Sequence, residues 1–325
     1  MQKTDTIAQI GESAALLRTI ARLNLGVSSI VGPGDDAAVV ASPDGRFVVT
    51  TDTMIEDHDF RLDWSSAFDL GYKAIATNVS DVAAMGAKPT ALTVALAVPS
   101  DTTVAWLEDF ADGLRAGCEA LAPGAAVVGG DLAGAPKVFI AITAHGDLEG
   151  RDPVLRSGAK PGDVLAVAGT LGRAAAGLAL LQFEDAEPAA AFDELVDVQL
   201  RPQPPIAAGV LAAKADATSM LDISDGLAKD AGRIAKASGV TVQIDSKLLQ
   251  GFDAALEQAA MRIGARERDW VLFGGEDHSL LATFAADAIL PREFKVIGRI
   301  IEAGDVSVLI DDEALPERGW DSVTG

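Results

Sequence analysis

In Asp222-Ile223-Ser224-Asp225-Gly226, an apolar run from residue 218 gives way to helical spacing over 226–238. A strand is therefore expected to end here and a helix to begin. The free N–H groups and the dipole at a helix start favour an anion at this point. Capping of the helix would explain Asp225 but not Asp222. The stretch therefore predicts a site that handles charged ligands.

Five further stretches repeat this design, in which an apolar run stops and a carboxylate follows among Gly, Ser or Thr residues. They are Gly34-Asp35-Asp36-Ala37, Thr50-Thr51-Asp52-Thr53, Asn78-Val79-Ser80-Asp81, Gly129-Gly130-Asp131 and Gly274-Gly275-Glu276-Asp277. Carboxylates that meet repel one another unless cations lie between them. Hard divalent cations are therefore predicted, with a nucleotide phosphate as their usual companion.

Each stretch also has a simpler interpretation. Asp36 suits a solvated turn, Asp52 a strand cap, and Asp131 and Glu276 tight turns beside glycines. Asp81 is more specific, because it shares a helix face with Thr77 and Asn78. That face could still be an exposed polar strip.

Length and composition predict two globular α/β or α+β domains. The chain has 325 residues, of which 49% are hydrophobic, and strands and helices interleave throughout. We place the domain boundary near residue 150, which divides the chain into residues 1–150 and 151–325. Helices are expected at 11–25, 65–85, 103–121, 173–182, 204–214 and 226–238. Strands are expected at 37–41, 47–51, 90–98, 125–128, 137–144, 164–168, 218–224, 240–244, 278–284, 294–300 and 306–310. Residues 188–191 are expected to form an Ala-rich turn.

The charge balance limits the partners. A formal net charge of −22 opposes binding to nucleic acid or to an anionic membrane, and we expect neither. No apolar run reaches the length of a membrane span, and no signal peptide is recognisable. A cytoplasmic protein is expected, with its single cysteine, Cys118, buried in a helix.

Several common catalytic signatures are absent from the sequence. There is no Gly-x-x-x-x-Gly-Lys-Ser/Thr loop, no protein-kinase motif set and no Gly-x-Ser-x-Gly elbow. The three histidines, His58, His145 and His278, lack zinc-site spacing.

Taken in order, the acidic stretches and Arg156-Ser157-Gly158-Ala159-Lys160-Pro161-Gly162-Asp163 resemble the thiamine-monophosphate kinases of the aminoimidazole ribonucleotide synthetase superfamily. The resemblance covers nearly the whole chain. It implies a two-domain fold with an N-terminal ATP- and Mg²⁺-binding domain whose sheet pairs with that of a second copy in a homodimer. It further implies a C-terminal α/β domain and ATP-dependent phosphorylation of thiamine monophosphate to thiamine diphosphate by direct in-line transfer.

The resemblance also implies roles for individual residues. Asp52, Asp81, Asp131 and Asp222 would be catalytic, bridged by metal to the β- and γ-phosphates of ATP. Several Mg²⁺ ions would be held by Asp36, Thr50, Thr51, Asp52, Asp81, Asp131, Asp222 and Asp225. ATP would contact Gly130, Asp131, Arg156 and Ser224, and the substrate would contact Asp59, Glu276 and Trp320.

The chain departs from the family pattern on the substrate side. Leu132 follows Asp131 where a threonine is usual, His278 replaces a tyrosine, and Asp59 stands where a histidine is common. Two alternatives stay open: another ATP-dependent enzyme of the superfamily that acts on a different small molecule, and a non-catalytic protein that binds nucleotide or thiamine phosphate.

Overall fold

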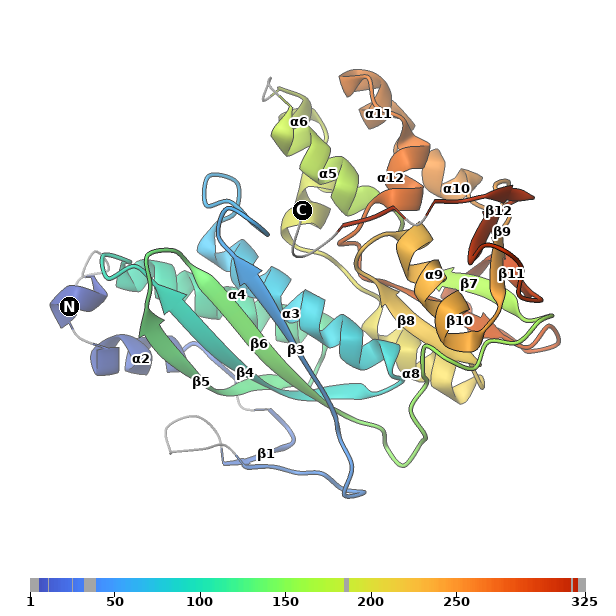
Figure 1. The fold of residues 1–325 in the computed structure, drawn as a ribbon. Helices are drawn as coiled ribbons and strands as arrows, with labels where there is room; N and C mark the ends of the chain where they lie inside the picture. The colour runs from blue at the N-terminus through green and yellow to red at the C-terminus, as the bar shows by residue number, and fades with distance from the viewer. Residues whose placement is uncertain are drawn as a thin grey trace. The chain divides into compact units, whose positions relative to one another are not determined.

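The computed structural model describes residues 6–10, 12–24, 26–31, 39–183, 187–316 and 318–320. The chain forms two compact units, Met1–Val82 with Lys88–Gly150, and Ala83–Ala87 with Arg151–Gly325 (Figure 1). Each unit combines a sheet with helices, which confirms the α/β (α+β) class. None of the helices in the described ranges is both long and apolar enough to cross a membrane.

The first unit is built on a four-stranded sheet with the order β3-β6-β4-β5. Its strands are β3 (Val48–Ile55), β4 (Lys88–Val98), β5 (Ala126–Gly134) and β6 (Phe139–Asp147). Only β4 and β5 run parallel. Helices α3 (Ala67–Ala84) and α4 (Val104–Leu121) lie on one face of the sheet (Figure 1). The unit also contains α1 (Ile7–Ile10), α2 (Glu12–Ile20), β1 (Ser29–Val31) and β2 (Val39–Val40).

Local signals set the ends of α3 and α4. At the start of α3, Ser66 Oγ accepts from the Asp69 N–H and the Asp69 carboxylate accepts from the Ser66 N–H, which is a capping box. Thr103 Oγ1 caps α4 by accepting from the Trp106 N–H. The helices pack closely, because a Cβ on Gly113 would lie 2.1 Å from the Phe68 carbonyl oxygen. In α4, Cys118 is buried as expected.

The open face of this sheet stays exposed within the unit. Along β3, the side chains of Val49, Thr51, Thr53 and Ile55 are exposed, while the alternating positions face α3 and are more buried. This period of two is the consequence of strand pleating. Phe47, just before β3, is also exposed.

The second unit is built on a seven-stranded sheet with the order β13-β12-β9-β11-β7-β10-β8. Its strands are β7 (Val164–Ala168), β8 (Ser219–Ile223), β9 (Thr241–Ile244), β10 (Ser279–Phe284), β11 (Phe294–Ile301), β12 (Val308–Ile310) and β13 (Glu313–Ala314). All pairs are antiparallel except β12 with β9. Strands β8 and β10 are buried along their whole length.

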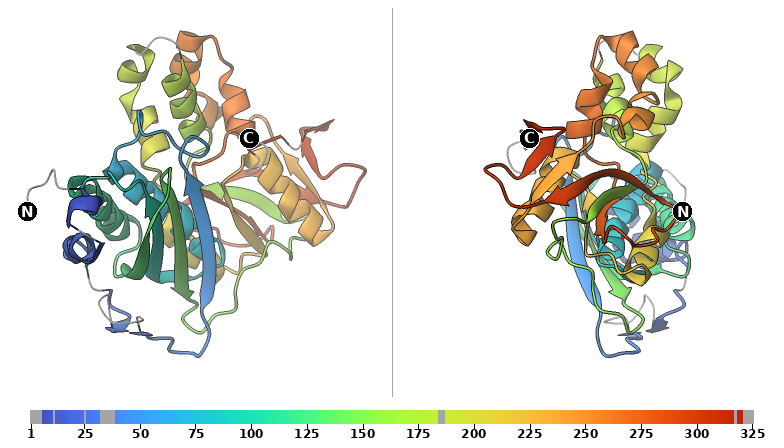
Figure 2. Two further views of the ribbon diagram at one scale, coloured as in Figure 1. Left: turned by 60° about the vertical axis from the view of Figure 1, so that its left-hand side comes forward. Right: turned by 90° about the vertical axis from the view of Figure 1, so that its right-hand side faces the viewer.

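Helices cover this second sheet and extend from it (Figures 1 and 2). They are α5 (Arg173–Gln182), α6 (Glu187–Ala191), α7 (Asp193–Leu200), α8 (Ile206–Lys214), α9 (Leu227–Ser238), α10 (Gln250–Asp253), α11 (Glu257–Ile263) and α12 (Glu267–Phe273). Leu221 and Ile223 of β8 pack into the core against Leu227 and Ala231 of α9. The other face of β8 therefore carries Met220 and Asp222.

Three sequence expectations were wrong in detail. Residues 188–191 belong to a short helix, α6, instead of a turn. Asp52 and Asp131 lie inside strands that continue past them, because pairing with β6 and β4 extends both strands beyond their apolar runs. Cross-strand hydrogen bonds are not visible in local composition.

Candidate functional site

In the first unit, β3 donates two hydrogen bonds to α3, and four polar residues take part. Thr50 Oγ1 donates to Asp81 Oδ2 at 2.8 Å, and the Asp52 N–H donates to Asn78 Oδ1 at 3.1 Å. Thr50 and Asp52 share one face of β3, and Asn78 and Asp81 share one face of α3. The structure therefore brings Thr50, Asp52 and Asp81 together where β3 lies against α3.

Asp131 projects from the opposite face of the same sheet. Asp52 pairs with Ile142, Ile142 with Val94, and Val94 with Gly130, and residues in such register share a face. Asp131 follows Gly130, so it faces the other way. Two strands separate β3 from β5, a span of about 14 Å at normal strand spacing. The expected meeting of Asp131 with Asp52 and Asp81 does not occur within one copy of this sheet.

Thr51 lies on the open face, as Asp131 does. Its hydroxyl donates to the Ile142 carbonyl oxygen at 2.8 Å and accepts from Thr143 Oγ1 at 3.3 Å. Gly130 could not be another residue without distortion, because a Cβ there would lie 2.3 Å from the Val94 carbonyl oxygen. This close approach explains one glycine of the Gly-Gly-Asp stretch.

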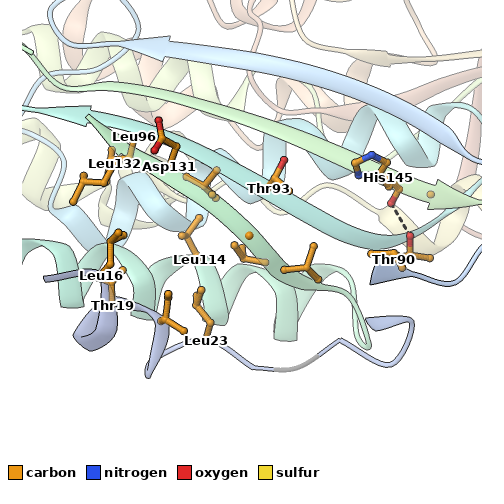
Figure 3. Close-up of a pocket in the computed structure, with 18 of the residues that line it drawn as sticks. Leu16, Thr19, Leu23, Thr90, Thr93, Leu96, Leu114, Asp131, Leu132 and His145 are labelled. Atoms are coloured by element: carbon orange, nitrogen blue, oxygen red, sulfur yellow. Dashed lines mark hydrogen bonds between the residues drawn. The ribbon is translucent and has the colours of Figure 1, made fainter. Parts of the chain in front are cut away.

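A cavity of about 770 Å³ borders Gly129, Gly130 and Asp131 (Figure 3). Its walls are mainly apolar and come from α2, α4, β4 and β5, among them Leu16, Leu114 and Val128. Asp131 and Leu132 lie toward one end of the cavity, and Thr90 and His145 toward the other (Figure 3). An apolar cavity with a few polar groups is the usual form of a small-molecule site.

In the second unit, Asp222 lies at the end of β8 and is buried. Its Oδ2 lies 3.2 Å from His278 Nδ1. Leu221 and Ile223 belong to the core that includes Leu227 of α9, and strand alternation puts Asp222 on the other face of β8. The strand-end position that the sequence predicted for Asp222 is confirmed, whereas the histidine beside it was not predicted.

Asp225 is held by cations of α9. Its carboxylate pairs with Lys229 Nζ at 3.0 Å and with the Arg233 guanidinium, and Arg233 also pairs with buried Asp230. Asp225 does not cap the helix: the N-cap residue is Gly226, and Asp230 accepts from the Asp225 N–H at 3.0 Å. Burial raises the pKa of Asp230 to about 7, against the opposing effect of Arg233.

The sequence already showed the spacing behind these contacts. Lys229 follows Asp225 by four residues and Arg233 follows it by eight, which puts all three on one side of a helix. This spacing could have identified the network. Because two cations already neutralise Asp225, its carboxylate is less suited to a metal in this arrangement than Asp222 is.

The Gly274-Gly275-Glu276-Asp277 stretch packs against the Ser224 loop. Glu276 adopts a left-handed backbone with φ 68°, donates its N–H to the Ser224 carbonyl oxygen and accepts at Oε2 from Gln199 at 2.7 Å. Asp277 has a structural role. It is buried, and it accepts from Thr170 Oγ1 and from the Arg173 and Ala174 N–H groups at the start of α5. Burial raises the pKa of Asp277, although these donors oppose the shift.

Trp320 reaches the same loop from the C-terminal end of the described chain. Its N–H donates to the Asp225 carbonyl oxygen at 3.0 Å, and its carbonyl oxygen accepts from Lys229. Gly319 permits this contact, because a Cβ there would lie 2.1 Å from the Asp225 carbonyl oxygen. Glu276 and Trp320 thus contact the consecutive residues Ser224 and Asp225 through their backbone N–H groups.

Arg156 lies away from this loop. The Arg156 carbonyl oxygen accepts from Ser238 Oγ, on the last residue of α9. The preceding residue, Leu155, accepts at its carbonyl oxygen from the Met220 N–H near the start of β8. The ends of α9 are about 16 Å apart at 1.5 Å per residue. The structure therefore does not bring Arg156 to Ser224 within the second unit.

Two further expected site residues remain. Asp59 binds the end of β3, with Oδ2 accepting from the Ile55 N–H at 2.8 Å and Oδ1 lying 3.1 Å from His58 Nδ1. This position is about 10 Å along the strand from Asp52. Asp36 lies outside the described residues.

The donor set is oxygen only, which is the chemistry that Mg²⁺ prefers. Across the ranges that the structure describes, no three His, Cys, Asp or Glu side chains are grouped so as to hold a metal ion by themselves. Mg²⁺ in nucleotide sites commonly uses one or two carboxylates, with phosphates and water completing its coordination. Two candidate positions fit this way of binding Mg²⁺. One is the pair Asp52 and Asp81, and the other is Asp222.

Family models match both parts of the chain. Residues 34–148 match AIR synthase related protein, N-terminal domain, and residues 160–311 match AIR synthase related protein, C-terminal domain. A thiamine-monophosphate kinase of Mycobacterium tuberculosis (strain ATCC 25618 / H37Rv) is 44% identical over 98% of this chain and 94% of its own. One of Bacillus subtilis (strain 168) is 37% identical over 82% of each chain.

Solved structures agree. The thiamine-monophosphate kinase from Stenotrophomonas maltophilia K279a has a TM-score of 0.75 and 33% identity, covering 93% of this chain and 96% of that one. AaThiL complexed with AMPPCP and TMP has a TM-score of 0.76 and 31% identity, covering 97% and 96%. The E. coli hydrogenase maturation protein HypE, at 18% identity and a TM-score of 0.67 over 94% of this chain and 98% of that one, shares the fold.

Proposed function

Because the chain belongs to the thiamine-monophosphate kinase family, we propose that it converts ATP and thiamine monophosphate to ADP and thiamine diphosphate. The observation that carries this proposal is the 44% identity over 98% of the chain. A related structure was solved with AMPPCP, an ATP analogue, and TMP, which supports the same pair of ligands here. The ATP that the reaction uses is abundant in the cytoplasm, where we expect the protein to work.

In the proposed reaction, a phosphate oxygen of thiamine monophosphate attacks the γ-phosphorus of ATP, and the bond from that phosphorus to the β,γ-bridging oxygen breaks. The acceptor oxygen is already a nucleophile near neutral pH, so no strong general base is needed. What the protein must supply is in-line positioning and neutralisation of charge. When bound, Mg²⁺ supplies the neutralisation.

Asp52, Asp81 and Asp222 are the proposed metal ligands that the described geometry supports best. Thr50 Oγ1 donates to the Asp81 carboxylate, and the Asn78 side-chain oxygen accepts from the backbone N–H of Asp52. Thr51, Asp36 and Asp225 stay in the proposed set from the family pattern. Asp225 would have to exchange its contacts with Lys229 and Arg233 for a metal.

We place the nucleotide base in the cavity beside Gly129 and Gly130. Its apolar walls suit a flat aromatic base, and the exposed backbone of the Gly-Gly-Asp stretch can approach phosphate closely. Arg156 and Ser224 remain proposed ATP contacts. Arg156 lies near the C-terminal end of α9, whereas Ser224 precedes the helix's start. A contact between Arg156 and ATP would therefore require part of the nucleotide to lie away from the Ser224 loop.

A homodimer would complete the site. Strands β3 and β5 are the two edges of the four-stranded sheet, and the sheet's open face exposes Val49 and Ile55. A second copy pairing through its own sheet would cover these groups and could bring its Asp131 to the β3 of this chain. The separation of Asp131 from Asp52 within one sheet supports this proposal.

Glu276 and Trp320 are the proposed contacts for the thiamine end, because both bind the backbone of Ser224–Asp225. Trp320 is 37% exposed and can stack on an aromatic ring. Asp59 is proposed as a further substrate contact only because it stands where the family commonly has a histidine.

The test is an assay of ATP conversion with Mg²⁺, with and without thiamine monophosphate, in which thiamine diphosphate is measured by chromatography. Formation of thiamine diphosphate that requires both substrates is the expected result. ATP consumption without that product would overturn the proposed acceptor, and no ATP consumption would favour a non-catalytic binding protein.

A further inference from the structure

His278 has a constrained backbone between the end of β8 and the start of β10. Its backbone is left-handed, with φ 50°, and its N–H donates to the Ile223 carbonyl oxygen at 3.1 Å. Asp277, just before it, is tied to the start of α5, and Ser279, just after it, begins β10. A left-handed backbone is uncommon for a residue other than glycine and persists where surrounding contacts impose it.

These contacts direct the ring toward Asp222. His278 Nδ1 lies 3.2 Å from Asp222 Oδ2, and both side chains are 6% exposed. An ionised carboxylate can only accept hydrogen bonds, so Nδ1 carries the proton in this pair when Asp222 is ionised. One carboxylate oxygen is therefore fixed by the imidazole.

We propose that His278 is a positioning residue that orients the Asp222 carboxylate for a divalent cation bound with ATP; this inference rests on the proposed function. The hydrogen bond to Oδ2 restricts rotation of the carboxylate, so that its orientation toward the cation is set before the cation binds. Leu221 and Ile223, the neighbours of Asp222 in β8, belong to the hydrophobic core, so neither can orient this carboxylate by a side-chain hydrogen bond.

The physical basis is the usual dependence of metal ligands on their hydrogen-bonding partners. Loss of such a partner typically weakens metal binding about 10- to 100-fold. The effect should appear in cation affinity, because His278 acts through Asp222 and makes no proposed contact with thiamine monophosphate.

The experiment uses the full chain with AMPPCP and Mn²⁺, and measures free Mn²⁺ by electron paramagnetic resonance. His278→Leu removes the donor and keeps much of the ring's volume. His278→Asn carries its amide nitrogen where histidine carries Nδ1, and asparagine tolerates a left-handed backbone. Thermal unfolding without metal is recorded for each variant.

We expect His278→Leu to weaken Mn²⁺ binding about 10- to 100-fold and His278→Asn to restore most of it. Equal Mn²⁺ affinity in wild type and the Leu variant would overturn the inference. A purely structural role would also overturn it, and would show as equal losses of thermal stability in both variants without a difference in Mn²⁺ affinity. If the Leu variant does not fold, His278→Gln, whose amide reaches the Nε2 position, replaces it.

Asp222→Asn separates this inference from the proposed function. If wild type makes thiamine diphosphate and Asp222→Asn weakens Mn²⁺ binding while His278→Leu does not, only the role of His278 fails. If wild type binds no Mn²⁺ with AMPPCP, the proposed metal site and the role of His278 both fail.

Discussion

Thr50 Oγ1 donates a 2.8 Å hydrogen bond to Asp81 Oδ2, which links the edge strand β3 to the last turn of helix α3. Thr50 and Asp81 are 31 residues apart in sequence. The contact orients Asp81 toward the strand that carries Asp52. A polar face on an otherwise Ala-rich helix is thereby turned into part of a candidate ligand site.

Replacing Asp81 with asparagine should lower turnover at least about 100-fold, which corresponds to about 2.7 kcal/mol of transition-state stabilisation. Asparagine keeps an oxygen that can accept from Thr50, so the fold should survive. Turnover and thermal unfolding should be measured beside Asp63→Asn, an exposed control paired with Arg61. Near-normal turnover of the Asp81 variant would contradict the metal-ligand role.

Mixing two inactive variants should restore activity if Asp131 acts on a partner's site. In a heterodimer of Asp81→Asn and Asp131→Asn chains, one site carries both changes and the other carries neither. Random exchange should therefore recover about one quarter of wild-type turnover, since half the dimers are mixed and each has one intact site. Sedimentation should be used to check that the chains form dimers. If subunit exchange is verified and turnover does not recover, Asp131 acts in the site of its own chain.

Asp277→Ala should destabilise the second unit. The substitution leaves the Thr170 hydroxyl and two N–H groups at the start of α5 without their buried acceptor, at a cost of about 2–3 kcal/mol. Urea unfolding should be compared with Asp287→Ala, an exposed control expected within about 0.5 kcal/mol of wild type. A loss no greater than that of the control would mean that Asp277 does not hold α5.

The stability of the protein without metal should depend on pH through Asp230. Its pKa is raised from 3.8 to about 7 in the folded state, chiefly by burial. Between these values the folded state binds more protons than the unfolded state, so this group's stabilising contribution is complete below pH 3.8 and is lost as pH rises toward 7.

Asp230→Asn removes that titration. The free energy of unfolding of the variant minus that of wild type should therefore increase from pH 4 to pH 7, as measured by urea unfolding with a chelator present. A constant difference across this range would show that Asp230 stays ionised beside Arg233.

The pattern of neighbouring residues in the sequence was sufficient to predict several helices and strands. The structure has β7 at Val164–Ala168 and α5 at Arg173–Gln182, both as expected, and α9 begins one residue later than expected. Capping residues and apolar periodicity act over a few neighbouring positions, so they can be seen in the sequence. The order of the acidic stretches likewise identified the family before any fold was known.

The sequence by itself therefore determined the two α/β units, the carboxylate stretches and the family. Only the tertiary structure decided which carboxylates meet. Strand register turned Asp131 to the face opposite Asp52, and α9 supplied Lys229 and Arg233 to Asp225. His278 reached Asp222 because β10 pairs with β8, although 56 residues separate them. Pairing between distant strands sets side-chain direction, and a change of register by one residue reverses it.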